Sequence, residues 1–459
     1  MAHSQPQTLT LDVERRAPGR RFPTPFHFFL EARRDPLAMM QAALREHGDI
    51  VRYDAWPLVA HLVFHPEHIK YVLQDNNRNY WKGNLIGRVK PLIGEGLFTS
   101  EGDFWRRQRR LAQPAFHRQR IETFASIMST AGARMLAGWE DIAAQDKPFD
   151  LMEEMSRVTL SVVGQALFGI DLIGAAGGVG RAMLVALQFV SEEAFHFFPA
   201  VLALPTPRNL RFKRARAELD RVVLGIIERR RQATDAGDDL LAMMMEARDA
   251  ETGEGMSDRQ LRDEIMTFIL AGHETTAVTL AWAWHLLAQH PGVAGRMHDE
   301  VSTVLAGNAP TLADLPRLEH TRRVIDETLR LYPPVAAISR ETFAADEIGG
   351  YAIPAKTGVM LSPYVTHRHP ALWPDPDHFD PQRFTPEQCA RRPRFAYFPF
   401  GGGPRLCIGN EFALMEATIL LAMMAQRYRI EAAPGHVVRH EVRVTLRPRQ
   451  PMLMRLRRV

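Results

Sequence analysis

The segment FGGGPRLCIG, residues 400–409, places Cys407 between a glycine turn and the predicted start of a helix. Unpaired N–H groups and the positive end of the helix dipole favour a thiolate, which is a metal ligand or a nucleophile. Consecutive glycines allow the backbone to approach a broad surface closely, and Arg405 could reach an anionic edge of it. Haem is a broad anionic group that accepts one axial thiolate, and thiolate ligation suits O–O bond cleavage. The alternative is a structural cysteine in a tight turn.

The pattern FxxGxRxC followed by Ile-Gly resembles the haem-binding loop of the cytochrome P-450 monooxygenases. Phe400, Gly403, Arg405 and Cys407 stand in the matching positions. The resemblance implies haem b, with Cys407 as the iron ligand and with Phe400, Gly401 and Arg405 as haem contacts. It also implies a mainly α fold with a small β region, in which a long central helix lies over the haem and the thiolate loop lies below it.

A long helix without proline is predicted upstream of this loop. Ser257 and Gln260 form a capping-box start, and Pro291 marks the end. The segment between them is roughly 33 residues, or about 50 Å at about 1.5 Å per residue. From Ile265 to Leu287 it is apolar on nearly every face, which indicates a helix buried in protein.

The middle of this helix carries Gly272, His273, Glu274, Thr275 and Thr276, which a buried helix should avoid. We expect a local break in the hydrogen-bond ladder, with Thr275 competing for a backbone carbonyl. A hydroxyl beside an acid, next to space for water, is a proton relay. The sequence AGHETT resembles the distal-helix pattern of the same family, which assigns Thr275 to stabilising dioxygen at the haem and Glu274 to proton supply. A satisfied helix kink is the alternative, and His273 is not counted as a ligand.

A charged pair and a distant arginine form the second constellation. Glu327 and Arg330 are three residues apart on one predicted helix face, followed by Pro333. They match the family's ExxR motif, and Arg383 in DPQRF resembles the arginine of its PERF segment, although Gln382 replaces the usual glutamate. The resemblance implies a structural triad that stabilises the core near the haem loop.

Four further positions predict contacts to the two haem propionates. Trp105 and Arg109 are four residues apart and resemble the family's WxxxR helix. Arg340 follows the ExxR helix in a strand-like segment and matches another propionate-binding position. With Arg405, they offer three guanidinium forks and one indole N–H for two carboxylates. Each residue alone would more often be a surface charge, and it is their joint spacing that carries the prediction.

The substrate pocket is expected to be apolar. Its walls are predicted in residues 81–98, 195–204 and 335–338, and small side chains should leave room above the iron. The individual residues expected at the pocket are Ala271, Val335, Ala336, Ala337 and Ile338. For the segment 195–204, ordinary core packing is the alternative to an access channel or lid. An apolar pocket favours a fatty acid, a terpenoid or a steroid, and the sequence does not select among them.

Composition sets limits on the whole chain. Its 459 residues contain no linker or repeat, so we expect an extended lead-in at 1–21 and one haem-thiolate monooxygenase domain at 22–459. The net charge of +4 is too small to indicate nucleic acid. Two cysteines imply no disulfide framework and fit a reducing cytosol. The N-terminal region lacks an apolar run near the ~20 residues of a spanning helix, so a cytoplasmic protein without a membrane anchor is expected.

The electron supply completes the prediction. Only about 50 residues follow Cys407, with no flavin or iron–sulfur domain among them, so electrons should come from a separate ferredoxin or flavodoxin. We expect such an acidic donor to dock at the basic segments 106–110 and 391–394. The leading hypothesis is a monooxygenase that uses O2 to hydroxylate a C–H bond or epoxidise a C=C bond. The alternatives are a haem-thiolate isomerase or peroxygenase without a redox partner, and a haem-based ligand sensor.

Overall fold

The longest helix crosses the helical part of the molecule. The structure, a computed structural model, describes residues 15–116, 121–170, 172, 179–194, 201–232 and 239–459. Helix α12 (Asp258–Gln289) begins at a capping box in which Ser257 and Gln260 each accept the other's backbone N–H, and it ends before Pro291. Most of its residues are buried, so both its predicted ends and its burial are confirmed.

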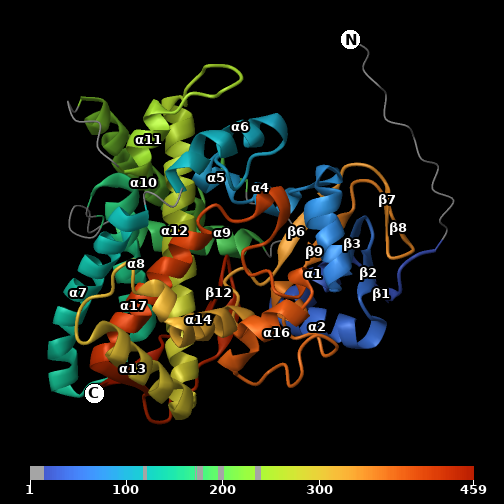
Figure 1. Ribbon diagram of the computed structural model, residues 1–459. Coiled ribbons are helices and arrows are strands. Elements are labelled where there is room, and N and C mark those ends of the chain that lie inside the picture. Colours follow the sequence, from blue (N-terminus) through green and yellow to red (C-terminus); the bar gives the residue numbers. More distant parts are fainter. Residues whose placement is uncertain (1–14, 117–120, 171, 173–178, 195–200, 233–238) are drawn as a thin grey trace.

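Other helices pack around α12, with α8, α10, α14 and α17 among its direct neighbours (Figure 1). The Trp282 ring of α12 stacks on Tyr332, which follows α14, with the ring centroids 4.1 Å apart. The remaining helices are α1 (Pro25–Arg34), α2 (Pro36–His47), α3 (Pro66–Lys70), α4 (Asn84–Gly87), α5 (Lys90–Ile93), α6 (Gly102–Ala112), α7 (Ile121–Gln145), α8 (Leu151–Phe168), α9 (Val179–Ala194), α10 (Pro207–Gln232), α11 (Leu240–Glu246), α13 (Pro291–Leu305), α14 (Glu319–Leu331), α15 (Pro363–Thr366), α16 (Pro386–Arg391) and α17 (Asn410–Arg427).

A six-stranded sheet lies to one side of the helical part, with α1 and α2 beside it (Figure 1). Its strand order is β1-β2-β3-β9-β6-β4, and the smaller sheets are β10-β13-β5, β11-β12 and β7-β8. The strands are β1 (Gly19–Arg21), β2 (Ile50–Ala55), β3 (Leu58–Val63), β4 (Tyr80–Trp81), β5 (Phe149–Asp150), β6 (Ile338–Thr342), β7 (Asp346–Ile348), β8 (Tyr351–Ile353), β9 (Gly358–Leu361), β10 (Tyr428–Ala432), β11 (His440–Val442), β12 (Leu446–Pro448) and β13 (Leu453–Arg458). This content confirms the predicted mainly α fold with a small β region.

The N-terminal strand lies inside the predicted lead-in. Strand β1 pairs in parallel with β2, from Gly19 opposite Arg52 to Arg21 opposite Asp54. Part of the segment 1–21 is therefore integrated into the sheet, whereas residues 1–14 are outside the described residues. In the part of the chain that the structure describes, no helix is both long enough and apolar enough to span a membrane.

Candidate active site

The cysteine loop is closed by a backbone hydrogen bond. The Cys407 N–H donates to the Phe400 carbonyl oxygen at 3.0 Å, and α17 begins three residues after the cysteine. Gly403 has φ 64°, and a Cβ atom built on it would lie 1.9 Å from the Leu73 carbonyl oxygen. Only glycine allows this close approach, which fixes the path of the chain immediately before the sulfur.

The acidity of Cys407 depends on its burial in the fold. Its side chain is accessible, yet it lies deep enough in the fold that burial raises the pKa of the thiol. A hydrogen bond with the Gly409 backbone and the charge of Arg109 lower that pKa without offsetting burial. Desolvation is thus the largest influence on the pKa of this thiol, and the thiolate stays a prediction. A bound metal ion supplies the charge that deprotonates a coordinating thiol.

One face in the middle of α12 is not covered by protein atoms. Ala271 is exposed and Thr275 is half-buried, whereas the side chains of His273, Glu274 and Thr276 are buried. The Thr275 hydroxyl donates to the Ala271 carbonyl oxygen at 2.6 Å, as predicted for a side chain that competes for a carbonyl. The expected break in the ladder is absent, since α12 is assigned as one uninterrupted α-helix through these residues. The Thr275 hydroxyl therefore bonds to the Ala271 carbonyl oxygen without interrupting the helix.

Glu274 faces away from the Thr275 hydroxyl. Its Oε1 accepts a hydrogen bond from the Thr445 hydroxyl at 2.9 Å and lies 3.6 Å from Arg447 Nη1. Burial raises the pKa of Glu274, with Arg447 opposing that shift. Consecutive helical residues point about 100° apart, which explains why the adjacent acid and hydroxyl have different partners. The buried imidazole of His273 has its pKa lowered to about 4 by desolvation, so it is neutral near pH 7.

Arg405 and Arg109 connect the cysteine loop to α6. Arg405 Nη1 donates to the Ser100 carbonyl oxygen at 2.9 Å, and its other Nη pairs with Glu101. Its guanidinium carbon lies 3.7 Å from the centroid of the Trp105 ring. Arg109 Nη1 donates to the carbonyl oxygen of Leu406, the residue before Cys407. The structure thus brings Trp105, Arg109 and Arg405 together, as their spacing predicted.

Arg340 adds a nearly uncompensated cation to the same cluster. Its side chain is buried, and the hydrogen bond described for it runs to the Ser339 carbonyl oxygen at 2.8 Å. Burial lowers the pKa of Arg340 to about 10, and the charge of Glu101 opposes this shift. Burial also lowers the pKa of Arg405 to about 10. These shifts show that the folded chain does not fully stabilise the positive charges it collects here.

Lys82 is a fourth cation that no motif in the sequence indicated. Its ammonium group donates to the Phe98 carbonyl oxygen and lies 4.8 Å from the centroid of the Phe98 ring. Burial lowers its pKa well below the usual value, and Arg405 and Arg340 lower it further. Glu101 accepts the Lys82 backbone N–H at 2.7 Å, so one carboxylate serves both Lys82 and Arg405.

The excess of positive charge fits the edge of a haem. We call Lys82, Arg109, Arg340 and Arg405 the cation cluster. Glu101 pairs directly with Arg405, which leaves an excess of three positive charges, and two haem propionates would neutralise two of them. The chain therefore offers a thiol for the iron and cations for the propionates within one site.

The wall predicted at 81–98 is attached to α12 by two carboxylates. Asp263 Oδ2 accepts the Glu95 N–H and Glu264 Oε2 accepts the Leu97 N–H, both at 2.9 Å. Burial raises the pKa of Glu264 to about 7. Within this range, Leu92 and Ile93 belong to the core and do not line a pocket. Hydrogen bonds from its backbone thus hold this segment against α12. Some of its apolar side chains pack in the core.

The strand-side pocket residues divide into two groups. Ala336 is buried in a core cluster with Phe22 and Tyr53, and Ala337 packs against the same cluster. Val335 is exposed, and Ala337 and Ile338 are half-buried. Ile338 Cδ1 would lie 3.8 Å from a Cβ atom built on Gly401, which places this side chain beside the cysteine loop.

The third predicted wall lies only partly within the described residues. Residues 195–200 are outside them. Val201 and Leu204, at the end of the predicted wall, are exposed. These two side chains are therefore surface residues in this structure.

The ExxR residues and Arg383 form a buried ionic triad. Glu327 and Arg330 are fully buried, with Arg330 Nε 2.6 Å from Oε2 and Nη2 2.8 Å from Oε1 of Glu327. Arg383 Nε lies 3.5 Å from Glu327 Oε1, which also accepts the Asp380 N–H at 2.9 Å. The remaining donors of Arg330 bond to the carbonyl oxygens of His367, Pro376 and His378. The triad binds α14 to the segment that leads to the cysteine loop.

The family model for cytochrome P450 matches residues 17–454. Cyclooctatin synthase of Streptomyces melanosporofaciens is 40% identical over 94% of this chain and 93% of its own length. Cyclooctat-9-en-7-ol 5-monooxygenase of the same organism is 38% identical over 88% and 86%. Pentalenene oxygenase of Streptomyces avermitilis is 35% identical over 92% and 93%. The crystal structure of the cytochrome P450DA heme domain superposes with a TM-score of 0.87 at 26% identity, covering 97% of this chain and 98% of that one.

The chain belongs to the cytochrome P450 family. It is an oxidoreductase of the P450 monooxygenase class, and its cofactor is haem b. The predicted P450 fold is confirmed by the match to solved haem domains. Sequence reasoning missed Lys82, Glu101 and Thr445, because their roles arise from contacts between distant segments and not from any local pattern.

Proposed function

We propose that residues 22–459 form one cytoplasmic monooxygenase domain that hydroxylates or epoxidises an apolar cyclic terpenoid, using electrons from a separate ferredoxin or flavodoxin. The observation that carries the proposal is the uncovered face of α12 at Ala271 and Thr275, in a helix otherwise enclosed by protein. A small side chain and a hydroxyl there leave space for an apolar substrate and a polar group for proton handling.

Several side chains of the chain would prepare the reaction. Haem bound through a thiolate supplies activation of O2. The Cys407 sulfur would hold the iron, and the cation cluster would fix the propionate edge. The Thr275 hydroxyl donates a hydrogen bond to the Ala271 carbonyl oxygen, and a rotation of its side chain would redirect this O–H group toward the reacting centre. Burial raises the pKa of Glu274, which favours its protonated form, and rotation away from Thr445 would allow it to supply a proton to Thr275.

The names of the relatives favour the terpenoid among the three predicted substrate classes. One relative is named for a cyclic alkenol, cyclooctat-9-en-7-ol, and another for the hydrocarbon pentalenene. Both names describe compounds with few polar groups. An apolar guest also suits Ile338, which lies beside the cysteine loop, and the methyl group of Ala271.

Substitution of Thr275 tests the proton-handling part of the proposal. In Thr275→Ala, electrons should be consumed at a similar rate while product per electron falls about tenfold, since general acid–base groups typically contribute a hundredfold or more. Product and peroxide are measured together in turnover with a terpenoid substrate and a ferredoxin system. Thr279→Ala is the matched control, because Thr279 also donates to a carbonyl one turn back but is buried. Equal coupling in Thr275→Ala and wild type would contradict the role.

The donor is proposed to dock at Arg391 and Arg394. On α6, Arg106 pairs with Asp103 and Arg110 pairs with Asp249, so much of that predicted positive surface is neutralised. Arg391 and Arg394 are exposed, and within the described ranges neither has a carboxylate at ion-pair distance. Arg392 is instead half-buried, with its guanidinium 3.9 Å from the Trp373 ring centroid. Arg392 therefore packs against the protein, and we leave it out of the proposed docking surface.

Charge reversal at this surface tests the docking proposal. Arg391→Glu should slow the first electron transfer about tenfold at low salt, and the difference should shrink at high salt, because steering is screened. Arg214→Glu, on α10 and away from α16 in Figure 1, is the matched exposed control. Stopped-flow reduction by the donor gives the rates. Rates independent of both salt and Arg391 would exclude this docking surface.

A further inference from the structure

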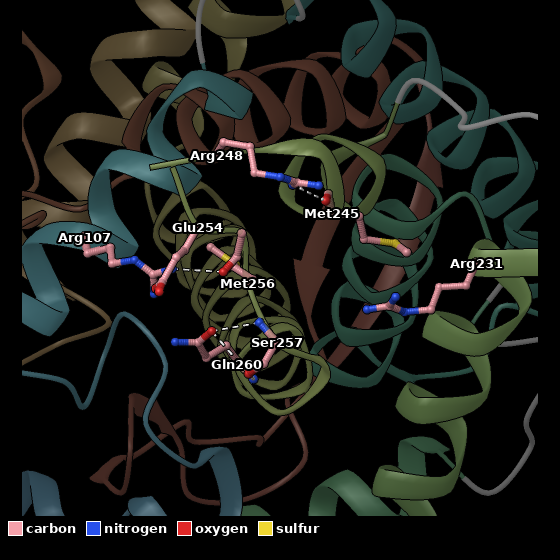
Figure 2. Close-up of a pocket in the computed structure, with 9 residues that line it drawn as sticks. Arg107, Arg231, Met245, Arg248, Glu254, Met256, Ser257 and Gln260 are labelled. Carbon is pink, nitrogen blue, oxygen red and sulfur yellow. Dashed lines mark hydrogen bonds and ion pairs between the residues drawn. The ribbon is translucent and has the colours of Figure 1, made fainter. Parts of the chain in front are cut away.

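A second polar cavity lies at the start of α12, and none of the predicted haem or substrate residues lines it (Figure 2). Its volume is about 500 Å³. Three guanidinium groups line it, from Arg107 of α6, Arg231 of α10 and Arg248 after α11, together with the single carboxylate of Glu254. The lining residues therefore carry a net charge of +2, three arginines against one glutamate.

Two of the arginines are held in place with donors still available. Arg107 Nη2 donates to the Gly255 carbonyl oxygen at 2.9 Å, while its Nε is buried and has no hydrogen-bond partner among the described residues. Arg248 Nη1 donates to three successive carbonyl oxygens at the end of α11, at 2.9 to 3.0 Å. A guanidinium fixed by one edge presents its other donors with little further loss of side-chain entropy.

The internal acids compensate these cations weakly. Glu254 Oε2 is 3.5 Å from Arg107 Nη2, and its own side chain is largely exposed. Arg231 pairs with Asp258, but both side chains are about half exposed, and such pairs contribute little. Arg107 and Arg231 extend toward the start of α12 from opposite sides (Figure 2). The positive end of the helix dipole adds to their charge.

We propose that this cavity binds a phosphate-bearing anion, either free or as a phosphate ester. Guanidinium groups bind phosphate oxygens in bidentate fashion, and three of them line this cavity. A cavity of this size holds a diphosphate or a small ester. The bound anion joins α6 to α10, α11 and α12. Because Arg107 lies two residues from Trp105 and Arg109, occupancy stabilises the helix that contacts the haem loop.

Titration calorimetry on the holoprotein with inorganic diphosphate tests the proposal. At constant ionic strength maintained with chloride, one saturable site is expected, with a rise in the unfolding temperature. Arg248→Gln and Arg231→Gln should each weaken binding about tenfold. Arg229→Gln should bind like the wild type, because Arg229 lies on the same helix but does not line the cavity. Unchanged haem spectra verify that each variant is folded.

Two outcomes overturn the proposal. The first is the absence of saturable binding up to about a thousandfold excess of diphosphate over protein, which would show that the site lacks useful affinity. The second is equal binding of diphosphate by all the variants. Separate titrations with inorganic phosphate and with glycerol phosphate distinguish the free anion from an ester. Tighter binding of the ester assigns the rest of the cavity to an organic group, whereas tighter binding of inorganic phosphate assigns the site to the free anion.

Discussion

Two charged clusters in this protein differ in whether the chain balances them. In the triad, Glu327 lies between Arg330 and Arg383, and nearby backbone groups satisfy most remaining donors and acceptors. In the cation cluster, Arg405 alone has a directly paired carboxylate among the described residues, Glu101, and burial lowers the pKa of both Arg340 and Arg405. Both arginines of the first cluster have a carboxylate partner within the polypeptide, whereas most basic groups of the second have none at ion-pair distance among the described residues, and haem propionates would supply such partners.

This difference separates structural from ligand-binding arginines. A buried ion pair with all its hydrogen bonds made is costly to break, because the remaining partner loses its compensation. A cluster of like charges costs stability until an anion arrives. Mutation should therefore affect the stability of the apoprotein at one cluster and the affinity for haem at the other.

The largest expected effect is at the triad. Arg330→Ala leaves the Glu327 carboxylate buried beside a weaker partner at 3.5 Å and should lower the free energy of unfolding by about 3–5 kcal/mol. Chemical denaturation of the apoprotein measures it. Arg322→Ala is the control on the same helix, because its pair with Asp326 is partly exposed and should contribute at most about 1 kcal/mol. A loss at Arg330 no larger than that at Arg322 would show that the triad is not structural.

A smaller and opposite effect is expected at Arg340. Arg340→Ala removes an uncompensated cation, so the apoprotein should keep its stability, while haem should dissociate about tenfold faster for the loss of one charged contact. Transfer of haem to an excess acceptor protein gives the rate. Arg368→Ala is the matched control, since this buried arginine pairs with Asp377 and should lose stability without changing haem release. If Arg340→Ala destabilised the apoprotein and left haem release unchanged, Arg340 would be a structural residue and not a haem-binding one.

Features that depend on neighbouring positions in the chain could be predicted from the sequence. The capping box at Ser257 and the stop at Pro291 give the ends of α12, because they act on adjacent backbone groups. Glu327 and Arg330 meet because residues three apart share a helix face. The hairpin of β7 and β8 turns at Gly349 and Gly350, where both residues have positive φ.

Features that depend on the tertiary environment could not be predicted. Burial in the fold raises the pKa of the Cys407 thiol, and no local pattern shows that burial. Glu274 takes Thr445 as its partner, a residue 171 positions away in the chain. Ala336 faces the sheet cluster, and the position of Lys82 beside Arg340 requires the packing of two remote strands. No local pattern encodes any of these contacts.

The ferrous carbonyl spectrum of the purified protein tests the central claim most directly, that Cys407 is the axial ligand of a haem held by the cation cluster. The account predicts the strongly red-shifted absorption band of a sulfur-ligated haem, and its loss in Cys407→Ala, whose fold is verified by circular dichroism. A colourless protein, or a carbonyl band of the kind given by nitrogen ligation, would contradict the claim.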